Sequence, residues 1–220
     1  MAVPPAWTAS RHRLLFLGQE TAHWTVPGDA TLPGAGTLRE VLALPDPLGA
    51  LTRAYAAFDF GVAAPRVHFI RALRRLEREL EGGRRGAVMW GNVGVIDAAP
   101  MGRASASIAA LPRGPRERVL GWQRGLLAAS IAALRPSAVL AASGPKYDAA
   151  LAAEFAGLRF EPVGEAAPRD LARLVHPRLP AASFRTYHPR TLEITKAPHL
   201  GTAIAMIAGG ADRRRPASES

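Results

Sequence analysis

The stretch LLFLGQE at residues 14–20 decides how the chain folds. Four apolar residues, a glycine and then polar side chains are typical of a buried parallel strand that ends at a ligand-binding edge. Three further apolar runs of similar length predict three more strands, at 87–90, 138–142 and 184–187. Stretches with helical periodicity occupy the intervals between them, at 37–44, 66–81, 116–135, 145–155 and 197–208.

This alternation predicts an α/β protein, because helices that follow parallel strands cover both faces of the sheet. A length of 220 residues suits one domain. We therefore expect a single three-layer α/β/α domain with a four-stranded, mainly parallel sheet over residues 13–209. An N-terminal extension would occupy residues 1–12, and a basic, disordered tail residues 210–220.

The composition narrows the classes of partner. The formal net charge of +10 favours a polyanionic partner, although the arginine clusters also suit solvated helix faces. The absence of cysteine excludes disulfides and thiolate-held metals. No His, Asp or Glu spacing indicates a metal site, and no glycine-rich motif indicates a cofactor. No uncharged apolar run is long enough to span a membrane, and no secretory signal is recognisable, so we expect a cytoplasmic protein.

Polar side chains follow each of the four predicted strands. Gln19 and Glu20 follow the first, Asn92 the second, Ser143 the third and His188 the last. The carboxyl ends of parallel strands meet at one edge of a sheet, where such folds bind ligands. A carboxylate, two carboxamides, a hydroxyl and an imidazole are therefore expected around one site.

Three motifs in this order resemble those of uracil-DNA glycosylases. GQETAH at 18–23 is similar to the family's GQDPYH, MWGNVGVID at 89–97 to the strand with its base-reading asparagine, and YHPRTL at 187–192 to HPSPLS. The chain thus resembles a divergent member of the uracil-DNA glycosylase-like superfamily. The resemblance implies an enzyme that cleaves the bond between a base and deoxyribose after the nucleotide has left the duplex.

The resemblance also assigns roles to the residues at the strand ends. Glu20, in place of the family's aspartate, would position water and offset the positive charge of the sugar. His188 would donate a hydrogen bond to the departing base. Gln19 and Asn92 would bind the base, since a carboxamide donates and accepts side by side.

The expected base pocket departs from the family at one position. Ala22 replaces the tyrosine whose ring blocks a 5-substituted base, and Trp24 is the candidate to replace that ring. We expect Trp24 to contact the base, and a uracil or modified pyrimidine to be the substrate. The aromatic platform for the base has only weak candidates, Phe58 and Phe60.

DNA is the expected partner of a monomeric protein. Ser143, Pro189 and Arg190 would contact phosphates. Leu192 stands where the family places a leucine that fills the gap left in the duplex. A second HPR, at 176–178, imitates the last motif, but no clear apolar strand precedes it, and we interpret it as a fortuitous repeat.

Two other interpretations remain open. A catalytically degenerate superfamily member would bind a base, a nucleotide or nucleic acid without cleavage, and the changes at Glu20 and Ala22 favour this alternative. A hydrolase with Ser143 as nucleophile would need the tight G-x-S-x-G turn, which AASGPK at 141–146 lacks.

Overall fold

The computed structural model describes residues 3–20, 43–46, 49, 67–95, 108 and 111–212. The predicted helix at 37–44 lies almost entirely outside these residues. Ala22, Trp24, Phe58 and Phe60 also lie outside them, as does the tail beyond 212. The expectations for these positions therefore remain predictions.

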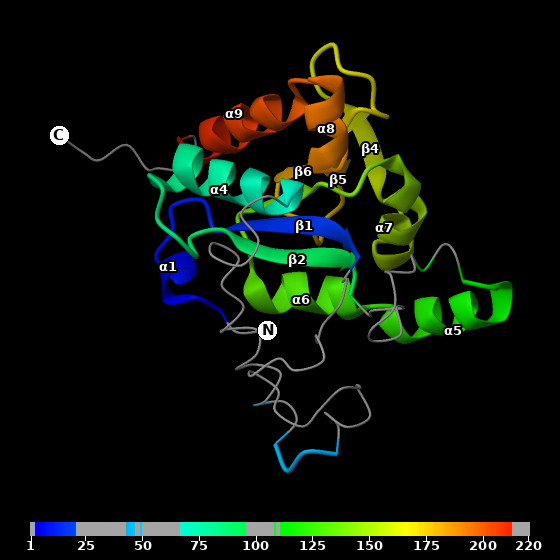
Figure 1. Cartoon of the computed structure of the whole chain (residues 1–220). Helices are drawn as coiled ribbons and strands as arrows, with labels where there is room; N and C mark the ends of the chain where they lie inside the picture. The colour runs from blue at the N-terminus through cyan, green and yellow to red at the C-terminus, as the bar shows by residue number, and fades with distance from the viewer. Residues whose placement is uncertain are drawn as a thin grey trace.

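The described residues form an α/β structure around a six-stranded mixed sheet (Figure 1). The strand order is β2-β1-β3-β6-β5-β4. The strands are β1 (Leu14–Glu20), β2 (Met89–Gly94), β3 (Ala138–Ala141), β4 (Arg159–Pro162), β5 (Leu171–Val175) and β6 (Ala182–Thr186). Strands β2, β1, β3 and β6 run parallel, whereas β5 is antiparallel to β6, and β4 to β5.

The α/β class is confirmed, but the four-stranded sheet was wrong. Each of the four predicted strands is present, and β4 and β5 extend the sheet beyond β6. Strand β4 has no buried residue, and Arg173 interrupts the apolar residues of β5, so neither strand carries an apolar run. An exposed strand at the edge of a sheet needs little apolar side-chain surface, which explains why the pattern did not reveal β4, whereas β5 is largely buried and only Arg173 interrupts its apolar residues.

The helices lie close to their predicted positions, except that no helix was predicted at Pro189–Thr195, and two further differences stand out. Gly125, with φ of 85°, breaks the predicted helix 116–135 into two. Trp7 is buried, and its indole N–H donates to the carbonyl oxygen of Leu14 at 3.1 Å, so part of the expected N-terminal extension packs on the domain. The helices are α1 (Pro5–Thr8), α4 (His68–Glu81), α5 (Arg113–Gln123), α6 (Leu126–Leu134), the 3₁₀ turn η2 (Pro145–Tyr147), α7 (Asp148–Glu154), α8 (Pro189–Thr195) and α9 (His199–Asp212).

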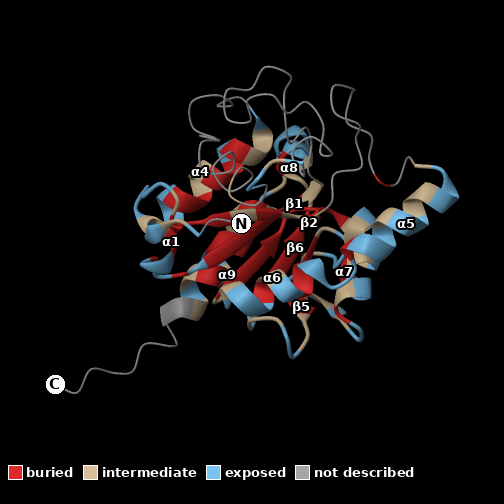
Figure 2. Cartoon of the chain, turned by 90° about the horizontal axis from the view of Figure 1, so that it is seen from below, coloured by how far each residue is buried: buried red, intermediate tan, exposed pale blue. Residues whose placement is uncertain are grey.

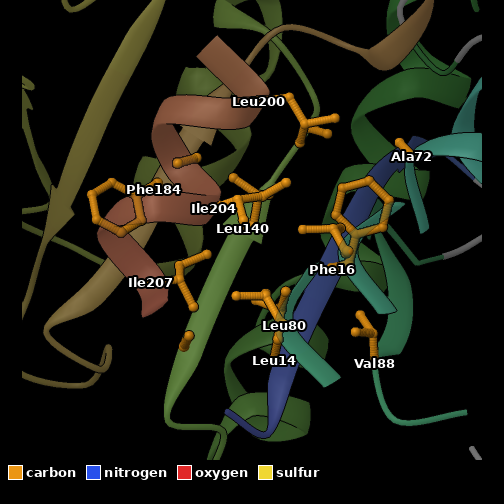
Figure 3. Packing of buried hydrophobic residues seen from close by; sticks show 14 of the residues in the cluster. Leu14, Phe16, Ala72, Leu80, Val88, Leu140, Phe184, Leu200, Ile204 and Ile207 are labelled. Carbon is orange, nitrogen blue, oxygen red and sulfur yellow. The ribbon is translucent and has the colours of Figure 1, made fainter. Parts of the chain in front are cut away.

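Two apolar cores lie on the two faces of the sheet. Successive side chains of a strand point to opposite faces, so Leu14 and Phe16 join the core under α4, α8 and α9, as Figure 3 shows. Leu15 and Leu17 join the core against α1, α6 and α7. Most residues of β1, β3 and β6 are buried, while α5 extends away from the body with only Gln123 buried (Figure 2).

Arg185 of β6 carries a buried ion pair at the border of the second core. Its side chain is 1% exposed, and its guanidinium donates to both carboxylate oxygens of Asp148, each at 2.9 Å. It also donates to the carbonyl oxygens of Pro168 and Arg169, at 2.7 and 2.6 Å. Burial raises the pKa of Asp148 above its ordinary value, although Arg185 acts in the opposite direction.

Replacement of Asp148 by alanine is expected to lower the free energy of unfolding by about 3 kcal/mol, because it leaves a buried guanidinium without its carboxylate. The matched control is Glu117→Ala, which removes the partner of the largely exposed Arg113 and should cost less than about 1 kcal/mol. Urea denaturation measures both changes. Equal losses in the two variants would contradict the importance given to Arg185.

Candidate active site

The carboxyl ends of β1, β2, β3 and β6 lie at one edge of the sheet, because these four strands run parallel. In Figure 1 the arrowheads of β1 and β2 point to the side on which α7 lies. The register pairs Gly18 of β1 with Asn92 of β2. The polar residues that follow these strands are thereby gathered at this edge.

A cavity of about 720 Å³ opens at this edge. Four of the predicted site residues line it: Gln19, Ser143, His188 and Arg190. The other lining residues are Gly144, Pro145, Lys146, Arg169, Tyr187 and Thr191. None of these ten residues is acidic, whereas Lys146, Arg169 and Arg190 are cationic.

Gln19 and Ser143 present polar groups to the cavity from neighbouring strands. The Gln19 amide nitrogen donates to the carbonyl oxygen of Ser143 at 2.9 Å, which fixes the orientation of the carboxamide. The Ser143 hydroxyl is fully buried and has no hydrogen-bond partner among the described residues. A buried hydroxyl without a partner is costly, so a ligand atom or an ordered water is expected to bind it.

His188 caps the N-terminus of α8 and is held as a hydrogen-bond donor. Its Nδ1 accepts from the backbone N–H of Arg190 at 3.3 Å, so the neutral ring carries its proton on Nε2. Burial lowers the pKa of His188, and His68, Lys146 and Arg190 lower it further. The imidazole is therefore neutral at pH 7, with Nε2–H available to an acceptor.

Two of the described residues donate hydrogen bonds to Glu20. The Tyr147 hydroxyl donates to Oε1 at 2.6 Å, and the backbone N–H of Ile108 donates to Oε2 at 3.0 Å. A Cβ atom at Gly94 would lie 2.9 Å from the Glu20 Cγ, so the glycine leaves room for the acid. The Glu20 carboxyl group is therefore held in one position at the end of β1.

Asn92 packs against the end of β1. A Cβ atom at Gly18 would lie 2.5 Å from Asn92 Oδ1 and 3.1 Å from a ring carbon of Phe69, so the glycine makes room for both. Phe69, on α4, stacks on Phe16 with ring centroids 4.5 Å apart. The structure thus places an aromatic ring beside Asn92.

Sequence reasoning missed Tyr147, Phe69 and Arg169. Tyr147 and Phe69 lie in stretches predicted as helices, where a half-buried aromatic residue is typical of packing. Arg169 lies in the connection between β4 and β5, two strands that were not predicted. No local motif marks any of the three.

Some predicted site residues lie elsewhere. Leu192 is 5% exposed and belongs to the core under α4 and α9, so the proposed insertion into a duplex is wrong for this residue. Pro189 is buried at the start of α8 and lines a different groove. Glu20 and Asn92 lie next to the residues of the cavity without lining it.

The second HPR lies at the opposite end of the strands, away from the carboxyl ends of the four parallel strands. It follows β5, a strand whose apolar residues are interrupted by Arg173, so a strand precedes it although no continuous apolar run does. However, β5 is antiparallel to β6, and Leu171 pairs with Thr186, so Val175 and His176 lie away from the carboxyl end of β6. The two HPR tripeptides are thus separated, and only His188 reaches the cavity.

The described ranges lack two kinds of feature. They contain no group of three or more His, Cys, Asp or Glu residues that could hold a metal ion. They also contain no helix that is long and apolar enough to cross a membrane. The chain matches no protein-family model, no curated protein and no solved structure.

An NMR titration of the histidine rings tests the environment of His188. We expect its midpoint below about 6.5, the ordinary value for histidine, because burial and the neighbouring cations disfavour its charged form. The unfolded chain takes up this proton near pH 6.5, whereas the folded chain does so only at lower pH. His188 therefore reduces stability as the pH falls through this interval. A midpoint at or above 6.5 would contradict the assignment, and His188→Gln identifies the resonance.

Proposed function

We propose that the protein hydrolyses the N-glycosidic bond of a uracil or modified pyrimidine base that has swung out of DNA. The observation that carries the proposal is the position of His188, a neutral donor that lines the same cavity as Gln19 and Ser143. The three sequence motifs support it as well, since their residues come from β1, β2 and the β6–α8 connection at one edge of the sheet.

The departing base gains negative charge as the bond breaks. A donor fixed at the developing anion stabilises it more than the uncharged ground state. Nε2–H of His188 is suited to this role, because Nδ1 is already occupied by the Arg190 N–H. The charges of Lys146 and Arg190 act on His188 and favour an anion in the same cavity.

The sugar becomes cationic in the same step. Glu20 would supply the matching anion and orient a water molecule for attack on the sugar. The hydrogen bond from Tyr147 keeps the longer glutamate side chain in one position. In this mechanism Tyr147 positions Glu20 and does not touch the substrate.

Asn92 and Phe69 supply what recognition of a base requires. A carboxamide reads adjacent donor and acceptor groups, and an aromatic ring suits a flat base. The two side chains lie together at Gly18, one residue before Gln19. We propose that this pair selects the base.

The second candidate is a protein that binds a base or nucleotide without cleavage. Both carboxylate oxygens of Glu20 are occupied by protein donors, and Glu20 does not line the cavity, which favours this alternative. The two candidates differ in one measurable property, the release of free base.

Excision of bases from a panel of oligonucleotides tests the proposal. The panel contains uracil, mismatched thymine, hypoxanthine and 5-hydroxymethyluracil, and strand cleavage at abasic sites is the readout. His188→Ala should lower single-turnover excision about 100-fold, as expected for loss of one charge-stabilising donor.

His176→Ala is the matched control, because it changes the same tripeptide at the opposite end of the strands and should keep full activity. Equal activity of the two variants would remove His188 from the mechanism. Oligonucleotide binding by the wild-type protein with no base released from any substrate would favour the second candidate.

Asn92→Asp tests whether the Asn92 carboxamide recognises the base. The change replaces the amide donor with a second acceptor, so the order of preference across the panel should shift. Asn92→Ala is the control that removes both groups and should weaken all substrates together. An unchanged order of preference with the aspartate would reject this role.

A further inference from the structure

Three exposed cations surround the cavity. Lys146 comes from η2, Arg169 from the β4–β5 connection and Arg190 from α8, and each lines the cavity. None of the three forms a salt bridge with a carboxylate in the part of the chain that the structure describes. The lining contains no acidic residue.

The other cationic hollow of the molecule differs in this respect. A groove of about 780 Å³ between α4 and α8 is lined by five arginines and Lys196, but much of its charge is paired within the protein. Arg71 pairs with Glu193, and Arg74 and Arg75 pair with the glutamates at 77 and 79, each at 2.6 Å. Three of its five arginines are therefore paired with glutamates, whereas none of the described carboxylates forms a salt bridge with the cations of the cavity.

Hydrogen bonds to its backbone and from its side chain fix the position of Arg169. The buried guanidinium of Arg185 holds the carbonyl oxygens of Pro168 and Arg169. The Arg169 side chain donates from Nε to the hydroxyl of Tyr187 at 3.3 Å, and Tyr187 also lines the cavity. The backbone and the side chain of Arg169 are thus both anchored at the rim.

Three like charges around one hollow repel one another, so their arrangement favours an anionic ligand. A pyrimidine base is neutral and does not balance them. Lys146 and Arg190 line the cavity together with His188, so their charges act on the same space. The phosphate groups attached to a nucleotide supply the missing charge.

We propose that Lys146, Arg169 and Arg190 together bind the phosphates on either side of a nucleotide whose base enters the cavity, so that the site takes a nucleotide within a polynucleotide. The nature of the nucleotide rests on the proposed function, but the contact between these cations and phosphate does not. Arg169 is the new element, since it comes from a hairpin that no motif marks.

Binding of a labelled oligonucleotide at several salt concentrations tests this inference. Arg169→Gln should weaken binding about five- to tenfold at 0.1 M salt and lower the slope of log affinity against log salt by about one, as expected for one lost phosphate contact. Arg169→Lys should retain most of the slope. Circular dichroism checks that each variant is folded.

Arg159→Gln is the matched control. Arg159 is an exposed arginine of the same hairpin, pairs with Glu161 and lies outside the cavity lining, so its loss should leave affinity and slope unchanged. Identical salt slopes for Arg169→Gln, Arg159→Gln and the wild type would overturn the inference. Absence of binding by the wild type to any oligonucleotide would overturn it too.

A competition arm distinguishes a polynucleotide from a free nucleotide. Deoxyuridine monophosphate should compete only at a concentration far above that of an oligonucleotide, because it offers one phosphate rather than two flanking ones. Equal competition would overturn the polynucleotide as the ligand. If Arg169→Gln lowers the salt slope but the wild-type protein releases no base, phosphate binding is upheld and excision is rejected. The two proposals can therefore be tested independently.

Discussion

The site depends on one buried guanidinium. Arg185 binds Asp148 at the first residue of α7 and the backbone of the β4–β5 connection at Pro168 and Arg169. Asp148 directly follows Tyr147, which holds Glu20. A single residue of β6 thus joins the two segments that border the cavity. A buried charge is stable only when each of its N–H donors has an acceptor. The start of α7 and the β4–β5 connection supply these acceptors only when both lie against Arg185.

The parallel part of the fold could be predicted because its signal is local. Buried parallel strands favour apolar residues, so β1 and β3 appear as short apolar runs, and β2 and β6 carry enough apolar residues beside Asn92 and Arg185 to be recognised. The rule that parallel strands present their carboxyl ends at one edge then located the site. Gln19, Ser143, His188 and Arg190 do line one cavity there, whereas Glu20 and Asn92 do not line it.

The remaining features depend on contacts between distant residues. Tyr147 meets Glu20 across 127 positions of the chain, and Arg169 reaches the cavity only because an antiparallel hairpin extends the sheet. The prediction for Leu192 was wrong for a related reason. The motif predicted an exposed side chain, but on α8 the side chain points into the core. Short motifs place the backbone of a site well, but the direction of each side chain follows from packing.

His188, the N-cap of α8, links the folding of this helix to the protonation of the imidazole ring. The Arg190 amide that stabilises the first turn of this seven-residue helix is also the group that keeps the proton off Nδ1 of His188. When the first turn frays, Nδ1 loses its donor, and the proton is free to exchange between the two ring nitrogens. Local unfolding of this one helical turn would then reduce the fraction of His188 rings that carry their proton on Nε2. The fraction of molecules with a hydrogen-bond donor facing the cavity therefore depends on how completely α8 is folded.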